Sequence, residues 1–494
     1  MDPQVLVIFG ASGDLARRKL IPALHSLHIQ KRLPVPFAIL GIGRTPLQDD
    51  SFREEMRKVL PAPVDPDFLT NLYFTSLDTE NFDVYSQLRS RLDDLCSALK
   101  IPHNIVYYLA VPPGLSERIP QWLAALKMQD ESDGHKRIVM EKPFGHDLQS
   151  AQALNRSLLS HWTEHQVYRI DHFLGKETVQ NLLVFRFANE IFDSLWNHRY
   201  VDYVEITAAE NLGVGTRAGY FDHTGIVRDM VQNHLLQVLA MVAMDPPLNF
   251  DADCVRHETM KVFKSLRPLQ EADFEQQVVF GQYEAAHVKE GILPGYLQEP
   301  GIAHISRTET FAALKIFVDH PRWFNVPFYL RTGKRMPTRV TEVVLHFKKT
   351  PHPAFGIHGG SVAAQNQLVL RIQPDEGILL KVALKEPGAG FRVKEVNMDF
   401  HYADLADTHV PEAYERLLLD VMQGDATLFA LGDAVETCWQ FIDPILQYHD
   451  AGAPLHIYPA GSWGPREADD LLSRDQRQWR YPCKNLAEEG ACVL

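Results

Sequence analysis

Acidic, basic and imidazole side chains follow directly on an apolar run in the stretch "VYRIDHFLGKE" at residues 167–177. The run ends with Asp171 and His172, and Lys176 comes one helical turn later. A carboxylate beside an imidazole suits proton transfer, and an imidazole with a lysine suits an anion. Taken singly, an Asp–His pair can also cap a helix and a lysine can simply be solvated.

A second polar group follows an apolar run in "RIVMEKPFG", where Lys142 and Pro143 come next to Glu141. The proline is either a plain strand terminator or part of a cis peptide that fixes Lys142 in a cleft. If both runs are parallel strands, Lys142 and Asp171 follow strands that end at the same edge of a sheet.

A third set lies in "AENLGVGTRAGYFDHTGIVRDMVQNHLLQVLAM", with Glu210 at the end of a strand-like run and Asp229 and His234 on a helical pattern. His234 has the apolar neighbours Met230 and Val231, so a buried, hydrogen-bonded core histidine is one interpretation. Residues five apart on a regular α-helix are separated by roughly 140°. Asp229 and His234 are therefore expected to flank a cleft without sharing one face of the helix.

The stretch "VLVIFGASGDLARRKL" indicates how a nucleotide could bind. Val5 to Phe9 is apolar throughout, which is typical of a buried parallel strand. Gly10 and Gly13 permit a tight turn, and a helix starting at Asp14 would direct its free N–H groups at a pyrophosphate. Ala16 replaces the third glycine of the dinucleotide fingerprint. The alternative is a glycine-flanked turn that binds no nucleotide.

The end of the next strand favours NADP over NAD. An NAD site normally has an acidic residue there for the ribose hydroxyls. The sequence "FAILGIGRT" ends instead in Arg44 and Thr45, and the first carboxylate is Asp49. A guanidinium fork suits a 2′-phosphate. Arg44 as an ordinary surface arginine remains the alternative.

The elements around the first groups predict an α/β domain over residues 1–175. Amphipathic stretches separate most of the strand candidates, which indicates crossover helices and a Rossmann-like, doubly wound parallel sheet. The candidates are Val5–Phe9, Phe37–Gly41, Leu72–Leu77, Ile105–Val111, Arg137–Glu141 and Val167–Asp171.

Residues 176–494 are predicted to form a large, mostly antiparallel sheet domain with helices. Several strand candidates alternate between apolar and polar residues, and "QPDEG" at 373–377 joins two of them as a hairpin. Helical patterns at 411–422 and 432–448 are expected to pack on this sheet. The strand candidates are 203–208, 312–318, 327–331, 342–347, 367–372, 378–384 and 393–400.

Composition restricts the class of protein. The 494 residues suffice for two domains, and 45% hydrophobic with 23% charged residues describes a soluble globular chain. A net charge of −14 argues against nucleic acid or an anionic membrane as a partner. The longest apolar stretch, 235–244, is too short to span a bilayer, and no signal peptide precedes the first strand, so a cytoplasmic location is expected. Five scattered cysteines lack metal spacing, so reduced thiols and no metal are expected.

The motifs together resemble the glucose-6-phosphate dehydrogenase family. "GASGDLARRKL", "EKPFG", "RIDHFLGKE", "GYFDHTGIVRDMVQNHLLQ" and "PFYLRTGKRM" occur in that family's order and cover most of the chain. The resemblance implies a homodimer or homotetramer that oxidises the anomeric carbon of glucose 6-phosphate to 6-phosphogluconolactone. It implies reduction of NADP at the entry to the pentose phosphate pathway.

The resemblance also implies roles for individual residues. His234 is expected to be the general base, and Asp171 to orient it and stabilise its imidazolium. Lys19 and Lys142 are expected between substrate and coenzyme. The residues implied for the substrate are His172, Lys176, Glu210, Asp229, Lys334 and Arg339, and those implied for the coenzyme are Gly10, Ser12, Gly13, Asp14, Leu15, Lys19 and Arg44.

Two positions depart from the pattern of the family. Phe173 stands where many relatives have tyrosine, and Arg339 where bacterial relatives often have lysine. Two other functions remain open at this point. A glucose–fructose oxidoreductase type would share the first domain and an "EKP" turn, and a non-catalytic NADP sensor would be expected to lack His234 or Asp171.

Overall fold

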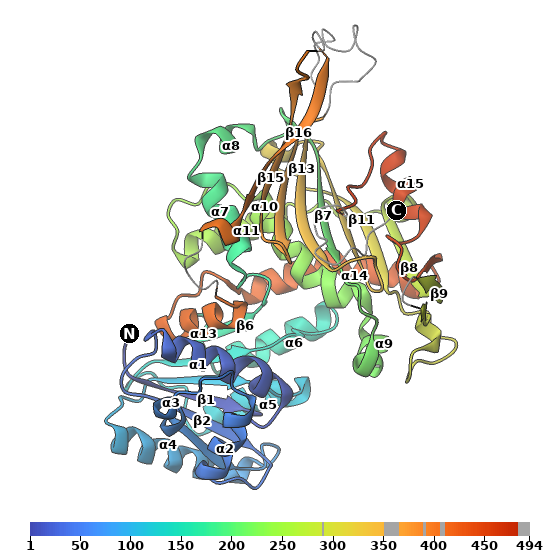
Figure 1. Ribbon diagram of the computed structural model, residues 1–494. Helices are drawn as coiled ribbons and strands as arrows, with labels where there is room; N and C mark the ends of the chain where they lie inside the picture. The colour runs from blue at the N-terminus through green and yellow to red at the C-terminus, as the bar shows by residue number, and fades with distance from the viewer. Residues whose placement is uncertain (289–290, 350–364, 389–391, 406–410, 483–494) are drawn as a thin grey trace. The chain divides into compact units, whose positions relative to one another are not determined.

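The computed structural model describes the whole chain except residues 289–290, 350–364, 389–391, 406–410 and 483–494. The chain divides into two compact units (Figure 1). Unit 1 comprises Met1–Glu177, Pro247–Arg256 and Pro411–Glu436, and unit 2 comprises Thr178–Pro246, His257–Val410 and Thr437–Leu494. The sequence boundary at 175/176 lies close to the first crossing, but two later segments of the chain also fold into unit 1.

Unit 1 contains the predicted parallel sheet. Its order is β17-β6-β5-β4-β1-β2-β3, and all neighbouring strands are parallel except the short β17. All six predicted strands of this region are present. The strands are β1 (Gln4–Phe9), β2 (Phe37–Gly43), β3 (Leu72–Ser76), β4 (Ile105–Leu109), β5 (Lys136–Met140), β6 (Val167–Ile170) and β17 (Phe429–Ala430).

Helices connect these strands, as parallel pairing requires. Chain order reverses at β1, because β2 and β3 lie on one side of it and β4 to β6 on the other. Ligands of doubly wound sheets bind at this switch point, beyond the carboxyl ends of the strands. The connecting helices are η1 (Ala16–Leu20, a π-helix), α1 (Ile21–Ile29), α2 (Asp49–Val59), α3 (Pro66–Thr70), α4 (Tyr85–Leu99), α5 (Pro113–Ala125) and α6 (Leu148–Leu159), with single turns η2 (Phe82–Val84) and η3 (Glu164–Gln166).

Helix α13 (Ala413–Gln423) was expected on the second domain, and this expectation is wrong. It belongs to unit 1, where Glu415 accepts hydrogen bonds from Ser26 and Gln30 of α1, each at 3.0 Å. Arg137 donates to the carbonyl oxygen of Val421 at 2.8 Å. The hydrophobic periodicity predicts a helix but does not identify the element on which it packs. Here the hydrogen bonds of Glu415 and Arg137 determine that element.

Unit 2 is built on a nine-stranded sheet in the order β16-β15-β14-β13-β7-β12-β11-β8-β18. The pairs β7–β12 and β8–β18 are parallel and the other pairs antiparallel, as the sequence predicted for most of this sheet. The strands are β7 (Val201–Ala209), β8 (Val278–Glu284), β11 (Phe311–Phe317), β12 (Pro327–Gly333), β13 (Val340–Phe347), β14 (Gln367–Gln373), β15 (Gly377–Lys385), β16 (Val393–His401) and β18 (Leu455–Pro459), with a separate hairpin of β9 (Ala286–Val288) and β10 (Gly291–Leu293).

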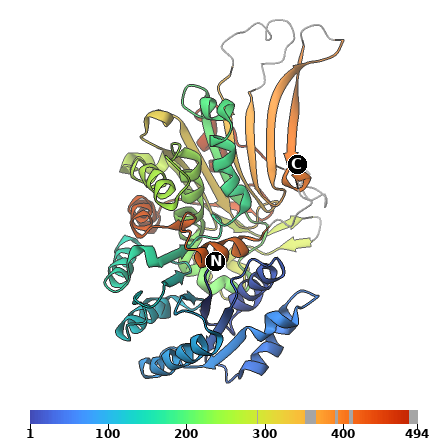
Figure 2. The same cartoon turned by 90° about the vertical axis from the view of Figure 1, so that its left-hand side faces the viewer.

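Helices of unit 2 lie against the large sheet, while β15 and the edge strand β16 extend beyond them (Figure 2). The predicted helix at 432–448 is α14 (Gly432–Asp450), which begins in unit 1 and continues in unit 2. Helix α11 (Ala252–Lys264) likewise begins in unit 1 and continues in unit 2. The others are α7 (Glu177–Phe187), α8 (Glu190–Leu195), α9 (Ala218–Ile226), η5 (Val227–Leu235, a π-helix), α10 (Leu236–Ala243), α12 (Glu271–Gln277) and α15 (Arg466–Ser473), with short turns η4 (Gly215–Arg217), η6 (Tyr296–Gln298), η7 (Pro321–Trp323) and η9 (Tyr402–Leu405).

Among the described residues, no helix is long and apolar enough to cross a membrane. Cys96, Cys254 and Cys438 carry free thiols. Cys483 and Cys492 lie outside the part of the chain that the structure describes.

Candidate active site

The turn after β1 has the geometry of a phosphate-binding turn. Gly10 has φ +80°, and a Cβ built there would lie 2.2 Å from the carbonyl oxygen of Ala110, so only glycine fits. Gly13 donates its N–H to the carbonyl oxygen of Gly10 at 2.9 Å, and a helix begins at Asp14. Unpaired N–H groups at that helix start can bind an anion. The residues present therefore fit a dinucleotide pyrophosphate.

Around this turn, side chains of the predicted coenzyme residues have partners of their own. Ser12 accepts a hydrogen bond from the Thr45 hydroxyl at 3.2 Å. Asp14 pairs with Arg18 at 2.7 Å, and Leu15 is half-buried. Lys19 pairs with Glu412 at 2.9 Å, a carboxylate that sequence reasoning did not connect with it because the two are far apart in the chain.

Arg44 follows β2 and is 73% exposed, with its Nη1 atom 3.6 Å from Glu80 Oε1. An exposed ion pair of this length contributes little free energy, so its guanidinium is available to a ligand phosphate. Sequence reasoning did not identify Glu80, which lies on the connection after β3. Its carboxylate is a competitor that a 2′-phosphate would have to displace.

At the end of β5, Glu141 and Lys142 carry the "EKP" motif. The Lys142–Pro143 peptide is cis. Glu141 Oε1 accepts hydrogen bonds from Tyr108 at 2.5 Å and from Tyr414 of α13 at 3.1 Å. Burial raises the pKa of Glu141, while the two tyrosine hydroxyls lower it. Helix α13 therefore contacts the segment that presents Lys142.

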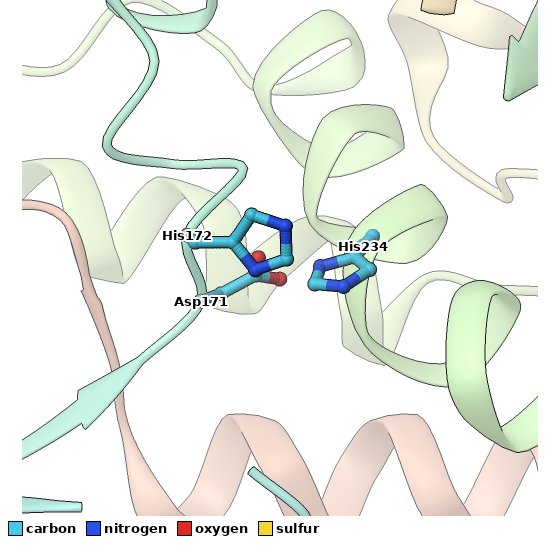
Figure 3. A group of neighbouring side chains, drawn as sticks. All are labelled: Asp171, His172 and His234. Carbon is cyan, nitrogen blue, oxygen red and sulfur yellow. The ribbon is translucent and has the colours of Figure 1, made fainter. Parts of the chain in front are cut away.

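The segment after β6 presents Asp171 and His172 (Figure 3). Asp171 is 4% exposed, and its Oδ1 atom accepts the Phe173 N–H at 2.9 Å. The Lys176 ammonium lies 3.9 Å from the centre of the Phe173 ring, and the His172 ring meets that ring edge-on at 5.2 Å. Phe173 thus holds the two predicted phosphate ligands of unit 1 against one aromatic surface.

In unit 2, Asp229 and His234 lie on η5, which is a π-helix and not the regular α-helix that the sequence analysis assumed. A π-helix pairs residue i with residue i+5, so residues five apart lie about one turn from each other. The separation of roughly 140° expected from α-helical geometry is therefore wrong, and Asp229 and His234 lie close to one face of η5. His234 is 1% and Asp229 8% exposed.

A cavity of about 440 Å³ lies beside this helix within unit 2. Glu210 follows β7 and Lys334 follows β12; since these strands are parallel neighbours, both residues leave the sheet at one edge. Lys334 Nζ lies 2.6 Å from Glu210 Oε2, 3.9 Å from Asp229 Oδ2 and 4.8 Å from the centre of the Phe221 ring. The cavity is lined by Glu210, Leu212, Gly213, Val214, Gly215, Thr216, Arg217, Tyr220, Phe221, Asp229, Lys334 and Arg335.

Two carboxylates and one ammonium around a cavity suit a ligand rich in hydroxyl groups, because carboxylates accept and ammonium donates hydrogen bonds. Sequence reasoning missed Arg217, Tyr220 and Arg335, although "GTRAGYF" and "TGKRM" were both singled out. Arg335 donates to Glu299 at 3.2 Å, a contact that the sequence does not reveal. Arg339 is exposed and is not among the residues that line the cavity.

Comparison with known proteins covers both units. Residues 7–181 match the model of the glucose-6-phosphate dehydrogenase NAD binding domain, and residues 183–480 match that of the glucose-6-phosphate dehydrogenase C-terminal domain. The chain belongs to the glucose-6-phosphate dehydrogenase family. The predicted coenzyme residues lie in the first matched range, and Glu210, Asp229, His234 and Lys334 lie in the second.

Individual relatives in the glucose-6-phosphate dehydrogenase family are similar over nearly their full length. The glucose-6-phosphate 1-dehydrogenase of Aggregatibacter actinomycetemcomitans is 51% identical over 97% of this chain and 97% of the relative. That of Treponema pallidum is 49% identical over 100% of this chain and 98% of the relative.

Solved structures of the family agree with this fold. A glucose-6-phosphate dehydrogenase in complex with its substrate glucose-6-phosphate has a TM-score of 0.89 at 32% identity, with 97% of this chain and 99% of that chain covered. The Mycobacterium avium glucose-6-phosphate 1-dehydrogenase has a TM-score of 0.82 at 35% identity, with the same coverage. Membership in this family excludes the glucose–fructose oxidoreductase type as the family of the chain.

Proposed function

We propose that the chain oxidises the anomeric carbon of glucose 6-phosphate to 6-phosphogluconolactone and reduces NADP. The observation that carries this proposal is the match of both family models to consecutive ranges that contain the dinucleotide turn and the sugar cavity. The reaction opens the pentose phosphate pathway, and we place it in the cytoplasm. Unit 1 serves the coenzyme, and unit 2 provides the sugar cavity.

His234 is the general base of this reaction. The anomeric hydroxyl must lose its proton as the carbon is oxidised, because a protonated lactone is high in energy. A ring nitrogen of a neutral imidazole accepts that proton, and Asp171 holds the productive tautomer and stabilises the imidazolium. Asp171 is 4% and His234 1% exposed, and this burial supports the assignment, because charged groups interact more strongly in a water-poor environment.

The substrate is held by cations and carboxylates with distinct tasks. His172 and Lys176 bind the phosphate, and their shared contact with Phe173 limits the freedom of both. Glu210 and Asp229 accept hydrogen bonds from sugar hydroxyls, and Lys334 between them donates. Arg339, exposed near the same sheet edge, adds positive charge toward the phosphate.

The coenzyme is bound by the turn at residues 10–15, through Gly10, Ser12, Gly13, Asp14 and Leu15, with Arg44 on its 2′-phosphate. When bound, NADP supplies the hydride acceptor. Lys19 and Lys142 lie between the coenzyme and the sugar, where each compensates negative charge on the phosphate groups. The close approach at Gly10 supports this arrangement, because any side chain there would fill the turn.

The enzyme is a homodimer or homotetramer that associates through the β15–β16 hairpin. One face of this hairpin is mostly apolar, and some of its side chains are exposed, such as Leu384 at 56% and Met398 at 62%. Apolar side chains in this arrangement are typical of an interface. Met398→Glu is expected to lower the mass measured by sedimentation; an unchanged mass would place the interface elsewhere.

A spectrophotometric assay tests the function directly. The purified protein is incubated with NADP and glucose 6-phosphate, and formation of reduced nicotinamide is followed by its near-ultraviolet absorbance. Matched reactions contain NAD or free glucose instead. Turnover of free glucose but not of glucose 6-phosphate would identify a different sugar dehydrogenase. Binding of NADP without turnover of either sugar would identify the non-catalytic sensor.

A further inference from the structure

Glu309 is a buried carboxylate to which the proposed reaction assigns no role. It precedes β11 and is 3% exposed. Its Oε1 atom accepts the Val227 N–H at 3.1 Å, and its backbone carbonyl oxygen accepts the Ile226 N–H at 3.0 Å. One residue therefore binds two consecutive N–H groups at the start of η5. N–H groups at helix starts lack partners within the helix, and a carboxylate there also interacts favourably with the helix dipole.

The chain is shaped to let this carboxylate approach. Gly225, the second-last residue of α9, has φ +71° and ψ 168°, a non-helical conformation that kinks the chain just before η5. A Cβ built on Gly225 would lie 2.2 Å from Glu309 Oε1. Both the kink and the missing side chain are therefore required for the contact between Glu309 and Val227.

A second group lies near the other oxygen of Glu309. His449 Nε2 lies 3.8 Å from Glu309 Oε2 and 3.1 Å from the carbonyl oxygen of Arg307. Since a carbonyl oxygen only accepts, Nε2 carries a hydrogen there. Burial raises the pKa of Glu309, and His449 and the Val227 N–H lower it.

We propose that Glu309 is a positioning residue that fixes the start, and hence the π-helical register, of the helix carrying Asp229 and His234. The role rests on the proposed function, in which His234 is the base and Asp229 holds the sugar. In a π-helix these two residues lie close to one face; after relaxation to an α-helix they would be turned roughly 140° apart. A carboxylate that fixes the first N–H groups at the kink keeps this segment in the π-helical arrangement, with Asp229 and His234 close to one face.

The test compares Glu309→Gln with Glu309→Ala. An amide oxygen can still accept the Val227 N–H, whereas a methyl group cannot. In Glu309→Ala we expect faster amide hydrogen exchange in peptides covering 222–236. We also expect kcat to fall roughly 10–100-fold, as for a misplaced catalytic group, with an unchanged KM for NADP. Glu309→Gln should restore the slow exchange and most of kcat.

Glu342→Ala is the matched control, because Glu342 is an equally buried carboxylate of unit 2 whose partner is Arg480. It should lower the thermal unfolding temperature without accelerating exchange in 222–236. The inference is overturned if Glu309→Ala leaves that exchange unchanged, if its kcat stays within about twofold of the parent, or if Glu309→Gln is as impaired as Glu309→Ala. Failure of the proposed base would appear separately, as retained activity in His234→Asn, whereas the exchange comparison requires no catalysis.

Discussion

The parts of the candidate site in unit 1 and in unit 2 are built differently. In unit 1, the predicted phosphate ligands lie on one short segment in which neighbours in sequence hold one another, as Asp171 holds the Phe173 N–H and Phe173 holds Lys176. Lys19 and Glu141 of unit 1 also meet distant partners, Glu412 and Tyr414. In unit 2, Lys334 meets Glu210 across 124 positions of sequence, and Glu309 meets Val227 across 82. The first kind of site can be recognised in a sequence, and the second requires the fold.

The largest effect is expected from His234→Asn, which tests the helix of unit 2. Without a base the anomeric proton has no acceptor, so turnover should fall by roughly two to four orders of magnitude while both ligands still bind. Initial rates and equilibrium binding of NADP measure the two quantities. The parent should also lose activity at low pH as the imidazole becomes protonated, and the variant should lack this dependence. Retention of more than about a tenth of the parental turnover would make His234 a core histidine.

Asp171→Asn tests whether unit 1 contributes to the same step. Asparagine keeps the side-chain size but removes the charge that stabilises the imidazolium, so turnover should fall to a similar extent. The double variant with His234→Asn should be little worse than either single variant, because residues that act as a unit have non-additive effects. Multiplicative losses in the double variant would show that the two act independently. Single-turnover measurements in each variant separate the chemical step from binding.

The fold shows the same division between local and long-range information. Every strand of the parallel sheet up to Asp171 follows from apolar runs of local sequence, and so do β7 and β11 to β16. The strands β8, β9, β10, β17 and β18 were missed. Of these, β8, β17 and β18 are short or mixed segments, which become strands only when a distant partner provides hydrogen bonds.

The helices differ in the same way. The pattern at 411–422 predicted α13 but not its packing on α1, which depends on Glu415. The pattern at 227–235 predicted a helix but not its π-helical form, because apolar spacing does not specify how the first N–H groups are bound. The contact that does so, from Glu309, comes from a remote part of the chain.

Lys334→Ala and Lys176→Ala compare a cation that contacts a distant residue in unit 2 with one that contacts a sequence neighbour in unit 1. Removing Lys334, whose side chain is 12% exposed, takes away the ammonium that lies 2.6 Å from Glu210 and 3.9 Å from Asp229, so the free energy of unfolding should fall by roughly 1–3 kcal/mol. The Lys176 ammonium lies against the Phe173 ring, a neighbour in sequence, and its removal should weaken glucose 6-phosphate far more than free glucose. Denaturant titration measures the free energy of unfolding, and KM for glucose 6-phosphate and for free glucose measures the effect on each sugar. Equal weakening of both sugars by Lys176→Ala would assign Lys176 a structural role.

Arg44→Ala tests the coenzyme side of unit 1. A charge-assisted contact to the 2′-phosphate is worth about 1.5–3 kcal/mol, so the preference for NADP over NAD should fall by roughly one to two orders of magnitude, almost entirely through KM for NADP. Glu80→Gln is the matched control, because it removes the carboxylate that pairs with Arg44 and should tighten NADP slightly. Equal losses with NADP and NAD would contradict the role of Arg44.

The smallest effect is expected at Phe173, and it tests whether a local contact in unit 1 can replace one that relatives make differently. The Lys176 ammonium lies 3.9 Å from the centre of the Phe173 ring, a distance at which a cation–π contact is worth about 0.5–2 kcal/mol. Phe173→Leu keeps the apolar volume but removes the ring, so KM for glucose 6-phosphate should rise by roughly 2- to 20-fold with kcat little changed. Phe173→Tyr keeps the ring and adds a hydroxyl. A modestly lower KM for glucose 6-phosphate would mean that the hydroxyl reaches the phosphate. An unchanged KM would mean that only the ring contributes to substrate binding. If Phe173→Leu binds the substrate as well as the parent, Lys176 does not depend on the aromatic surface, and the phosphate itself must orient its ammonium.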